Sequence, residues 1–357
     1  MEKLITIVIP TYNMEKYLDK CLTSLIVPDE YMELLEVLVV NDGSKDNSSA
    51  IAHRYEDKYP QTFRVIDKEN GNYGSCVNRG LKEAAGKYIK ILDADDSFDN
   101  ENWKKFLDVL DSIEADLILT DYNMVAPNGE TIEHRRFNII PSQLHEAPQI
   151  ISALIEVEMH AVTYRKALIQ EIKYQQSEGI SYTDTEWVVI PMVDVQTVVY
   201  HPIMLYKYLV GREGQTMDPK IHSKKRHERL QIHYRLLAFY EKRNSCRGSM
   251  HSYLQTKLHG IFLRNYVQSL IQNDFPSKEL IAFDKTLRQK APDIHRALDN
   301  VTFSNIRIVS LWRQNGYSIP FTDLLMIHLI RYKQRWLPWL RVGRAKRTTT
   351  TCNPTMS

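Results

Sequence analysis

The chain has 357 residues, 43% of them hydrophobic and 25% charged, and its formal net charge is only +2 at pH 7. This length allows one large domain or two with a sizeable core, and so small a net charge argues against a protein wrapped in nucleic acid. The cysteines form no CxxC pair, which argues against a zinc site and structural disulfides and favours a reducing cytoplasm; they are Cys21, Cys76, Cys246 and Cys352.

The first residues form a strand-like apolar run without the basic segment and cleavage site of a signal peptide. No stretch approaches the roughly 18–20 apolar residues of a membrane span. We therefore expect a cytoplasmic protein that contacts a membrane only at its surface.

Short apolar runs alternate with helical patterns over residues 1–120. Strands are predicted at 4–9, 35–40, 63–66, 88–92 and 117–120, and helices at 15–25, 47–59, 75–85 and 103–113. The strands are continuously apolar and often β-branched, which is typical of strands buried on both faces of a sheet. The alternation predicts βαβ crossovers and an α/β fold with a mostly parallel sheet.

The pattern loosens after residue 121 and becomes helical after about residue 220. We predict a polar excursion at 122–138, a helix at 148–157, a strand at 160–164, a helix that ends near 192, and strands at 195–200 and 204–208. Helices follow at 224–242, 251–272 and 277–289, with shorter pieces up to residue 312. This change predicts two domains, at 1–220 and 221–357.

The carboxy-terminal segment 321–347 interleaves leucine and tryptophan with lysine and arginine. Such a composition suits a helix that lies on an anionic membrane surface. The alternative is an ordinary terminal helix followed by a disordered basic tail.

The most conspicuous polar stretch is the acidic run after the fourth strand. Asp93 and Asp95 are two positions apart, so on an extended or turning backbone their carboxylates point the same way. Two such oxygen donors suit Mg²⁺ or Mn²⁺ and leave positions for phosphate oxygens. The alternative is an acidic turn that caps the next helix, with the N-cap at Asp96, Ser97, Asp99 or Asn100.

Polar groups follow the first three strands as well. Thr11 and Asn13 follow the first strand, Asp42 follows the second, and the stretch 70–74 follows the third. Because ligands bind beyond the carboxyl ends of strands in open α/β sheets, the joint placement predicts one nucleotide site. The GxGxxG fingerprint and the P-loop are both absent, which argues against nicotinamide and flavin enzymes.

These motifs resemble, in their order, those of family 2 glycosyltransferases with the GT-A fold. The resemblance is strong over residues 4–120 and looser to about residue 218. It rests on Val-Ile-Pro-Thr-Tyr-Asn at 8–13, Val-Asn-Asp-Gly-Ser at 40–44, Asn-Gly-Asn-Tyr-Gly at 70–74, and Leu-Asp-Ala-Asp-Asp at 92–96. It implies a GT-A domain with a nucleotide-binding half at 1–120 and an acceptor half at 121–220, followed by a helical region.

The resemblance implies a UDP-sugar donor and a bound Mn²⁺ or Mg²⁺. Asp95 would be the direct metal ligand, and Asp93 would reach the ribose or a metal-bound water. Arg212 would pair with phosphate oxygens, and His222 would either complete the metal shell or be a solvated surface histidine. The remaining expected nucleotide contacts are Pro10, Tyr12 and Asn13 around the base and ribose, Asp42 on the uracil ring, and Asn72, Gly74 and Arg79 along the nucleotide and diphosphate.

The resemblance also places the catalytic base at Asp184, where Thr183 replaces the usual Glu of a Glu-Asp pair. Glu186 is the alternative base. The alternative for Asp184 is a helix N-cap, because Thr183 to Glu186 has the composition of a capping box, and one residue could serve in both roles. His160 and Trp187 are candidates for the acceptor pocket, with core packing as the alternative for Trp187.

The function implied is an inverting, metal-dependent glycosyltransferase. It would act on a glycan or lipid-linked saccharide acceptor, in the synthesis of a bacterial surface polysaccharide. The alternatives are a non-catalytic docking module and a sugar nucleotidyltransferase, which normally has a Gly-rich basic loop after the first strand. The residues do not specify the sugar, the linkage or the oligomeric state.

Overall fold

The computed structural model describes residues 3–212, 215, 225–244, 248–272, 277–302 and 306–319. Two of the sequence expectations, metal binding by His222 and membrane contact through 321–347, lie outside these residues. Among the described helices, none combines the length and the apolar character needed to cross a membrane.

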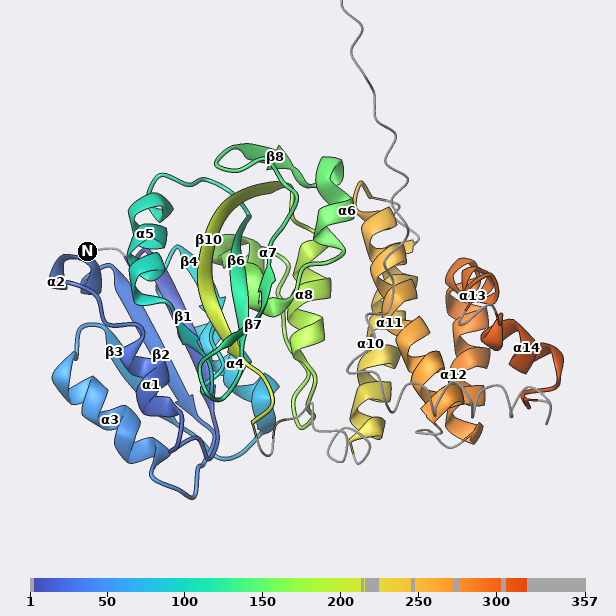
Figure 1. Cartoon of the computed structure of the whole chain (residues 1–357), viewed down its shortest axis with the longest axis horizontal. Helices are drawn as coiled ribbons and strands as arrows, with labels where there is room; N and C mark the ends of the chain where they lie inside the picture. The colour runs from blue at the N-terminus through green and yellow to red at the C-terminus, as the bar shows by residue number, and fades with distance from the viewer. Residues whose placement is uncertain are drawn as a thin grey trace, which may run out of the picture.

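The described strands form one mixed sheet with the order β3-β2-β1-β4-β9-β6-β10-β5 (Figure 1). The first four are parallel to one another, β9 is antiparallel to both of its neighbours, and β10 runs parallel to β6. The strands along this path span Phe63–Asp67 (β3), Leu35–Asn41 (β2), Ile5–Thr11 (β1), Tyr88–Ile91 (β4), Val162–Arg165 (β9), Leu117–Val125 (β6), Thr197–Leu209 (β10) and Ser97–Phe98 (β5).

Helices flank this sheet and fill its crossovers. They are α1 (Leu18–Thr23), α2 (Asp29–Met32), α3 (Ser48–Lys58), α4 (Asn72–Glu83), α5 (Asn100–Leu110), α6 (Ile151–Leu154), α7 (Lys166–Glu171) and α8 (Asp184–Met192). All seven residues of β1 are buried, as the continuous apolar pattern predicts. The predicted α/β architecture is therefore confirmed.

Three local predictions differ from the structure. The two strands expected at 195–200 and 204–208 are one strand, β10, whose pairing register shifts between His201 and Tyr206. The polar excursion at 122–138 is a hairpin, because β6 continues to Val125 and pairs with β7 (Thr131–Arg135). The third difference is at α4, which begins at Asn72 rather than at about residue 75.

The helical region packs against one side of the α/β region (Figure 1). It comprises α10 (Arg226–Asn244), α11 (His251–Gln272), α12 (Ser277–Lys290), α13 (Pro292–Asp299) and α14 (Ile308–Gln314). Helix α10 lies along α8, and α11 lies along α6, where Lys257 Nζ donates to the carbonyl oxygens of Ile155 and Val157 at 2.7 and 2.8 Å. Buried apolar residues of both regions form one continuous core. The domain boundary near residue 220 stays a prediction.

Candidate active site

The parallel part of the sheet changes direction of winding at β1. Strands β2 and β3 lie on one side of β1 and β4 lies on the other, so the topological switch point lies here. Open α/β sheets bind ligands in a crevice at the carboxyl ends of the strands beside this point, and we expect the crevice of this protein there. Thr11 pairs with Asn41, and Asn41 pairs with Asp67, so the ends of β1, β2 and β3 are level. The polar residues that follow these strands are therefore brought to one edge, as predicted.

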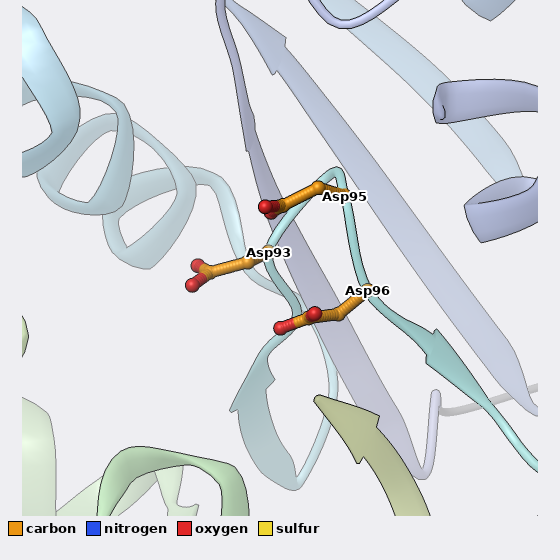
Figure 2. Close-up of side chains that lie close together, drawn as sticks. All are labelled: Asp93, Asp95 and Asp96. Atoms are coloured by element: carbon orange, nitrogen blue, oxygen red, sulfur yellow. The ribbon is translucent and has the colours of Figure 1, made fainter. Parts of the chain in front are cut away.

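The acidic run forms the turn between β4 and β5. Carboxylate oxygens of Asp93, Asp95 and Asp96 lie within 4.8 Å of one another and point to the same side of the turn (Figure 2). Asp96 is buried and accepts hydrogen bonds from Tyr206 Oη and the Leu209 amide, both at 2.7 Å. Asp96 thus ties the turn to β10.

The capping role weighed for this stretch belongs to Asp99. Its side chain accepts a hydrogen bond from the Asn102 amide at 3.1 Å, at the start of α5. Asp93 and Asp95 take no part in that cap.

Asp93 and Asp95 have the donor chemistry of a divalent-cation site. Burial and the charge of Asp95 raise the pKa of Asp93 to about 7, although Tyr73 Oη donates a 2.7 Å hydrogen bond to its Oδ1. Crowded carboxylates of this kind are stabilised in their ionised form by a hard cation. The residues therefore fit Mn²⁺ or Mg²⁺.

Arg212 lies against the acidic turn, since its Nε forms an ion pair with Asp95 Oδ2. Its guanidinium also sits over the ring of Tyr17, 5.2 Å from the centroid. The sequence predicted a phosphate contact for Arg212, and the structure places this cation beside the same turn.

At the other end of the crevice, Asp42 is buried and accepts two hydrogen bonds at Oδ1. The donors are Lys68 Nζ at 2.6 Å and the Gly71 amide at 2.9 Å. Tyr12 is 45% exposed, and Asn13 has a φ of 53° and accepts a hydrogen bond from the Lys45 amide. Pro10 is buried within β1. These residues lie together at the ends of β1 and β2, as predicted.

The three residues of α4 that are expected to contact the nucleotide or diphosphate, Asn72, Gly74 and Arg79, differ from one another in their surroundings. Asn72 begins α4 with a φ of 66°. A Cβ on Gly74 would lie 1.8 Å from the carbonyl oxygen of Ser177, so Gly74 permits close packing of the chain against α4. Arg79 is exposed and pairs with Glu83 at 2.9 Å, on the surface of α4.

Asp184 is the first residue of α8 and follows the N-cap Thr183. The negative charge of Asp184 contributes to the raised pKa values of both Tyr73 and Asp93, which places its carboxylate near the acidic turn. Burial raises the pKa of Asp184 itself. A carboxyl group with a raised pKa in a crevice has the properties of a general base.

The capping box expected at Thr183 to Glu186 does not form. Thr183 makes no side-chain cap bond, and its Oγ1 accepts a 2.7 Å hydrogen bond from Gln176 Nε2 instead. Glu186 is fully buried, and its two oxygens accept from the amide and the hydroxyl of Ser177, each at 2.8 Å. Glu186 is thus occupied by internal contacts, which leaves Asp184 as the better placed carboxylate.

Aromatic rings pack together beside the acidic turn, where Tyr206 Oη donates to Asp96. The His160 ring stacks on Tyr208 at a centroid distance of 4.2 Å, and also contacts Tyr122 and Tyr206. Trp187 is fully buried against Tyr164 and Tyr174, which supports its core-packing alternative.

Sequence reasoning singled out neither Lys68 nor Tyr208 as a site residue. Lys68 follows β3 directly, so the rule of polar residues at strand ends applies to it. Tyr208 lies within β10, and burial raises its pKa, with further contributions from the charges of Asp96, Asp93, Asp184 and Asp95. No local pattern marks it, because only the fold brings β10 beside the acidic turn.

Comparison with known proteins shows what this chain is similar to. Residues 6–172 match the model of glycosyl transferase family 2. An uncharacterized glycosyltransferase of Mycoplasma genitalium, MG025, is 43% identical over 104 residues, which are 29% of this chain and 35% of that protein. The minor teichoic acid biosynthesis protein GgaB of Bacillus subtilis is 32% identical over 133 residues, 37% of this chain and 15% of that protein.

The poly(ribitol-phosphate) beta-N-acetylglucosaminyltransferase TarS of Staphylococcus aureus is 27% identical over 217 residues, 60% of this chain and 36% of that protein. The matches thus cover only part of these relatives. The crystal structure of TarS 1-349 in complex with UDP-GlcNAc superposes with a TM-score of 0.64 at 19% identity, and covers 88% of this chain and 92% of that one. The fold is therefore GT-A, and residues 6–172 of this chain match the model of glycosyl transferase family 2.

Proposed function

We propose that this protein is an inverting, metal-dependent glycosyltransferase that moves a sugar from a UDP-sugar to a hydroxyl group of a glycan or lipid-linked acceptor. The observation that carries the proposal is that carboxylates from two separate segments of the chain lie near one another. Asp93 and Asp95 come from the turn after β4, and Asp184 comes from the start of α8.

The acidic turn would bind the donor diphosphate through a divalent cation. Asp95 and Asp93 would hold the cation, and Arg212, which lies beside Asp95, would pair with phosphate oxygens. The bound cation would stabilise the negative charge that accumulates on UDP as it departs.

Asp184 would act as the general base. Its carboxylate would accept the proton of the acceptor hydroxyl while that oxygen attacks the anomeric carbon from the side opposite UDP. A single displacement of this kind inverts the anomeric centre. The raised pKa of Asp184 brings its basicity closer to that of a useful base near neutral pH.

Other parts of the crevice suit a uridine nucleotide. Asp42, Tyr12 and Asn13 lie at the ends of β1 and β2, beyond which the base and ribose would bind. The structural neighbour TarS has been crystallised with UDP-GlcNAc and with UDP, which supports a UDP-sugar donor. The names of TarS and GgaB concern cell-wall polymers, which supports an acceptor of the cell-surface polysaccharide class.

The test is UDP release from a panel of UDP-sugars with Mn²⁺ or Mg²⁺. Slow hydrolysis is measurable without the acceptor, so the assay identifies the donor first. Cation-dependent release from one donor, lost in Asp95→Ala and in Asp184→Asn, is the expected result. Failure of every donor both to react and to bind in the presence of cation would overturn the proposal and favour a docking module.

A further inference from the structure

The loop that leads into α8 lies between α4 and α10. We define this loop as residues 175–183, which end at the N-cap of α8. On the α4 side, Asn78 Nδ2 donates to the Gln176 carbonyl at 2.9 Å, and the Gln176 amide donates back to Asn78 Oδ1 at 2.8 Å. The Gly179 amide also donates to the Gly71 carbonyl at 3.0 Å. The loop is therefore held to the helix that carries Tyr73.

Three side chains of the helical region hold the same loop from the other side. Arg235 of α10 donates from Nη1 to Ser177 Oγ at 2.7 Å and from Nη2 to the Gln175 carbonyl. Near the other end of the loop, the Ser181 amide donates to Glu228 Oε2 at 2.6 Å, and Lys225 Nζ donates to Ser181 Oγ at 2.5 Å.

Arg235 also reaches the buried carboxylate of Glu186. The distance from Arg235 Nε to Glu186 Oε1 is 3.4 Å, and Glu186 accepts both hydrogen bonds of Ser177. Burying a carboxylate costs free energy unless it is paired and hydrogen-bonded. The contacts of Glu186 with Arg235 and Ser177 therefore favour a single conformation of the loop and of the first turn of α8. Glu186 is two residues from Asp184, within the same first turn of α8.

We propose that Arg235 and Glu186 are positioning residues, by which the helical region fixes the carboxylate of Asp184 relative to the acidic turn. This inference rests on the proposed function, because it takes Asp184 as the general base. It gives the helical region a part in the chemistry and gives Glu186 a role other than that of a base. Misplacement of a reacting group by about 1 Å costs up to roughly 100-fold in rate, so such contacts act on turnover rather than on donor binding.

The test compares Arg235→Met with Arg243→Met in the full-length protein. Arg243 is a matched control, because it lies on the same helix and pairs with Asp194, beyond the end of α8 and away from the loop. Arg235→Met leaves Glu186 its two hydrogen bonds from Ser177, so we expect the variant to fold. Turnover is expressed per UDP-binding site, measured by titration with UDP and Mn²⁺, so that loss of folded protein is not counted as loss of rate.

We expect kcat per site to fall by about 10-fold to 100-fold in Arg235→Met, with the affinity for UDP unchanged, and both to be unchanged in Arg243→Met. Arg235→Lys should recover part of the loss, since lysine keeps the charge without the forked donors. Adding Glu186→Gln to Arg235→Met should cost little more, because the two side chains act as a unit. Equal kcat per site in Arg235→Met and wild type would overturn the proposal.

A second measurement does not depend on activity. Amide hydrogen exchange over residues 175–186 should be faster in Arg235→Met than in Arg243→Met, because the loop loses its contacts with α10. If the wild type turns over no donor, the proposed function fails while this comparison still tests the positioning. Identical exchange in the two variants would show that Arg235 does not hold the loop.

Discussion

The two sources of carboxylates in the candidate site are held in different ways. The acidic turn follows β4 directly, so the hydrogen bonds of the sheet fix its backbone, and Asp96 anchors it to β10. Asp184 begins a helix after a long loop, and side chains of α4 and α10 donate hydrogen bonds to that loop at Gln176 and Ser177. Half of the site is thus set by the sheet and half by packing between distant segments. Variants on the two sides should fail in different ways.

The largest effect is expected on the side of the sheet. Asp95→Ala should remove the main cation ligand and lower UDP release by roughly 1,000-fold, since a cation contributes several kcal/mol to stabilising the leaving group. The measurement is UDP release at saturating donor over a range of Mn²⁺ concentrations. If high Mn²⁺ restored full activity to Asp95→Ala, Asp95 would contribute only to the affinity for the cation.

On the loop side, Asp184→Asn should lower transfer by at least about 100-fold while UDP binding is kept. An amide keeps the shape of the carboxylate but is a poor proton acceptor. Glu186→Gln is the contrasting variant, because Glu186 is buried against Ser177, and it should cost less. If Glu186→Gln lost more transfer activity than Asp184→Asn, Glu186 would be the better candidate for the general base.

The pH dependence of transfer should report the same carboxylate. Burial raises the pKa of Asp184 above its ordinary value of 3.8, and the base must be ionised to act. Below the pKa of the base, kcat/KM should increase about tenfold per pH unit. Because the pKa of Asp184 is raised, kcat/KM should level off at a higher pH than it would with a free aspartate as the base. Saturating Mn²⁺ keeps Asp93 ionised during the measurement. If the residual activity of Asp184→Asn kept the same dependence on pH on the acidic side, the titrating group would be a residue other than Asp184.

The smallest effect tests how closely the loop packs on α4. Gly74→Ala places a Cβ 1.8 Å from the backbone oxygen of Ser177, which cannot yield as a flexible side chain would. We expect a loss of about 1–3 kcal/mol in the free energy of unfolding, measured in urea. Gly260→Ala is the control, because nothing lies within 4 Å of its Cβ on α11. That control should gain up to about 1 kcal/mol.

The sheet half of the site could be predicted because its rule is local. Asp42 and Asp93 each follow an apolar run, and parallel strands bring such positions to one edge. The predicted GT-A fold, with its helical carboxy-terminal region, is confirmed on the same basis.

The loop half could not be predicted in the same way. The sequence pattern predicts Glu186 as a capping residue or an alternative base. In the structure its partners are Ser177 and Arg235, which local spacing does not reveal. For the same reason local spacing does not mark Tyr208. Arg79 pairs with Glu83 on the surface of α4, and its expected place along the nucleotide and diphosphate stays a prediction. Tertiary contacts decide which polar residues near a site face it.

The long sequence separation of these contacts has a consequence for folding. Asn78 and Gln176 are 98 positions apart, and Asp93 and Tyr206 are 113 apart, whereas the strands β1 to β4 all lie within the first 91 residues. Bringing distant segments of the chain together lowers its entropy before the stabilising contacts between them can form, so such contacts tend to form late in folding. In refolding from denaturant we expect the circular dichroism of the sheet and helices to recover first, and UDP-sugar turnover to return in a slower phase.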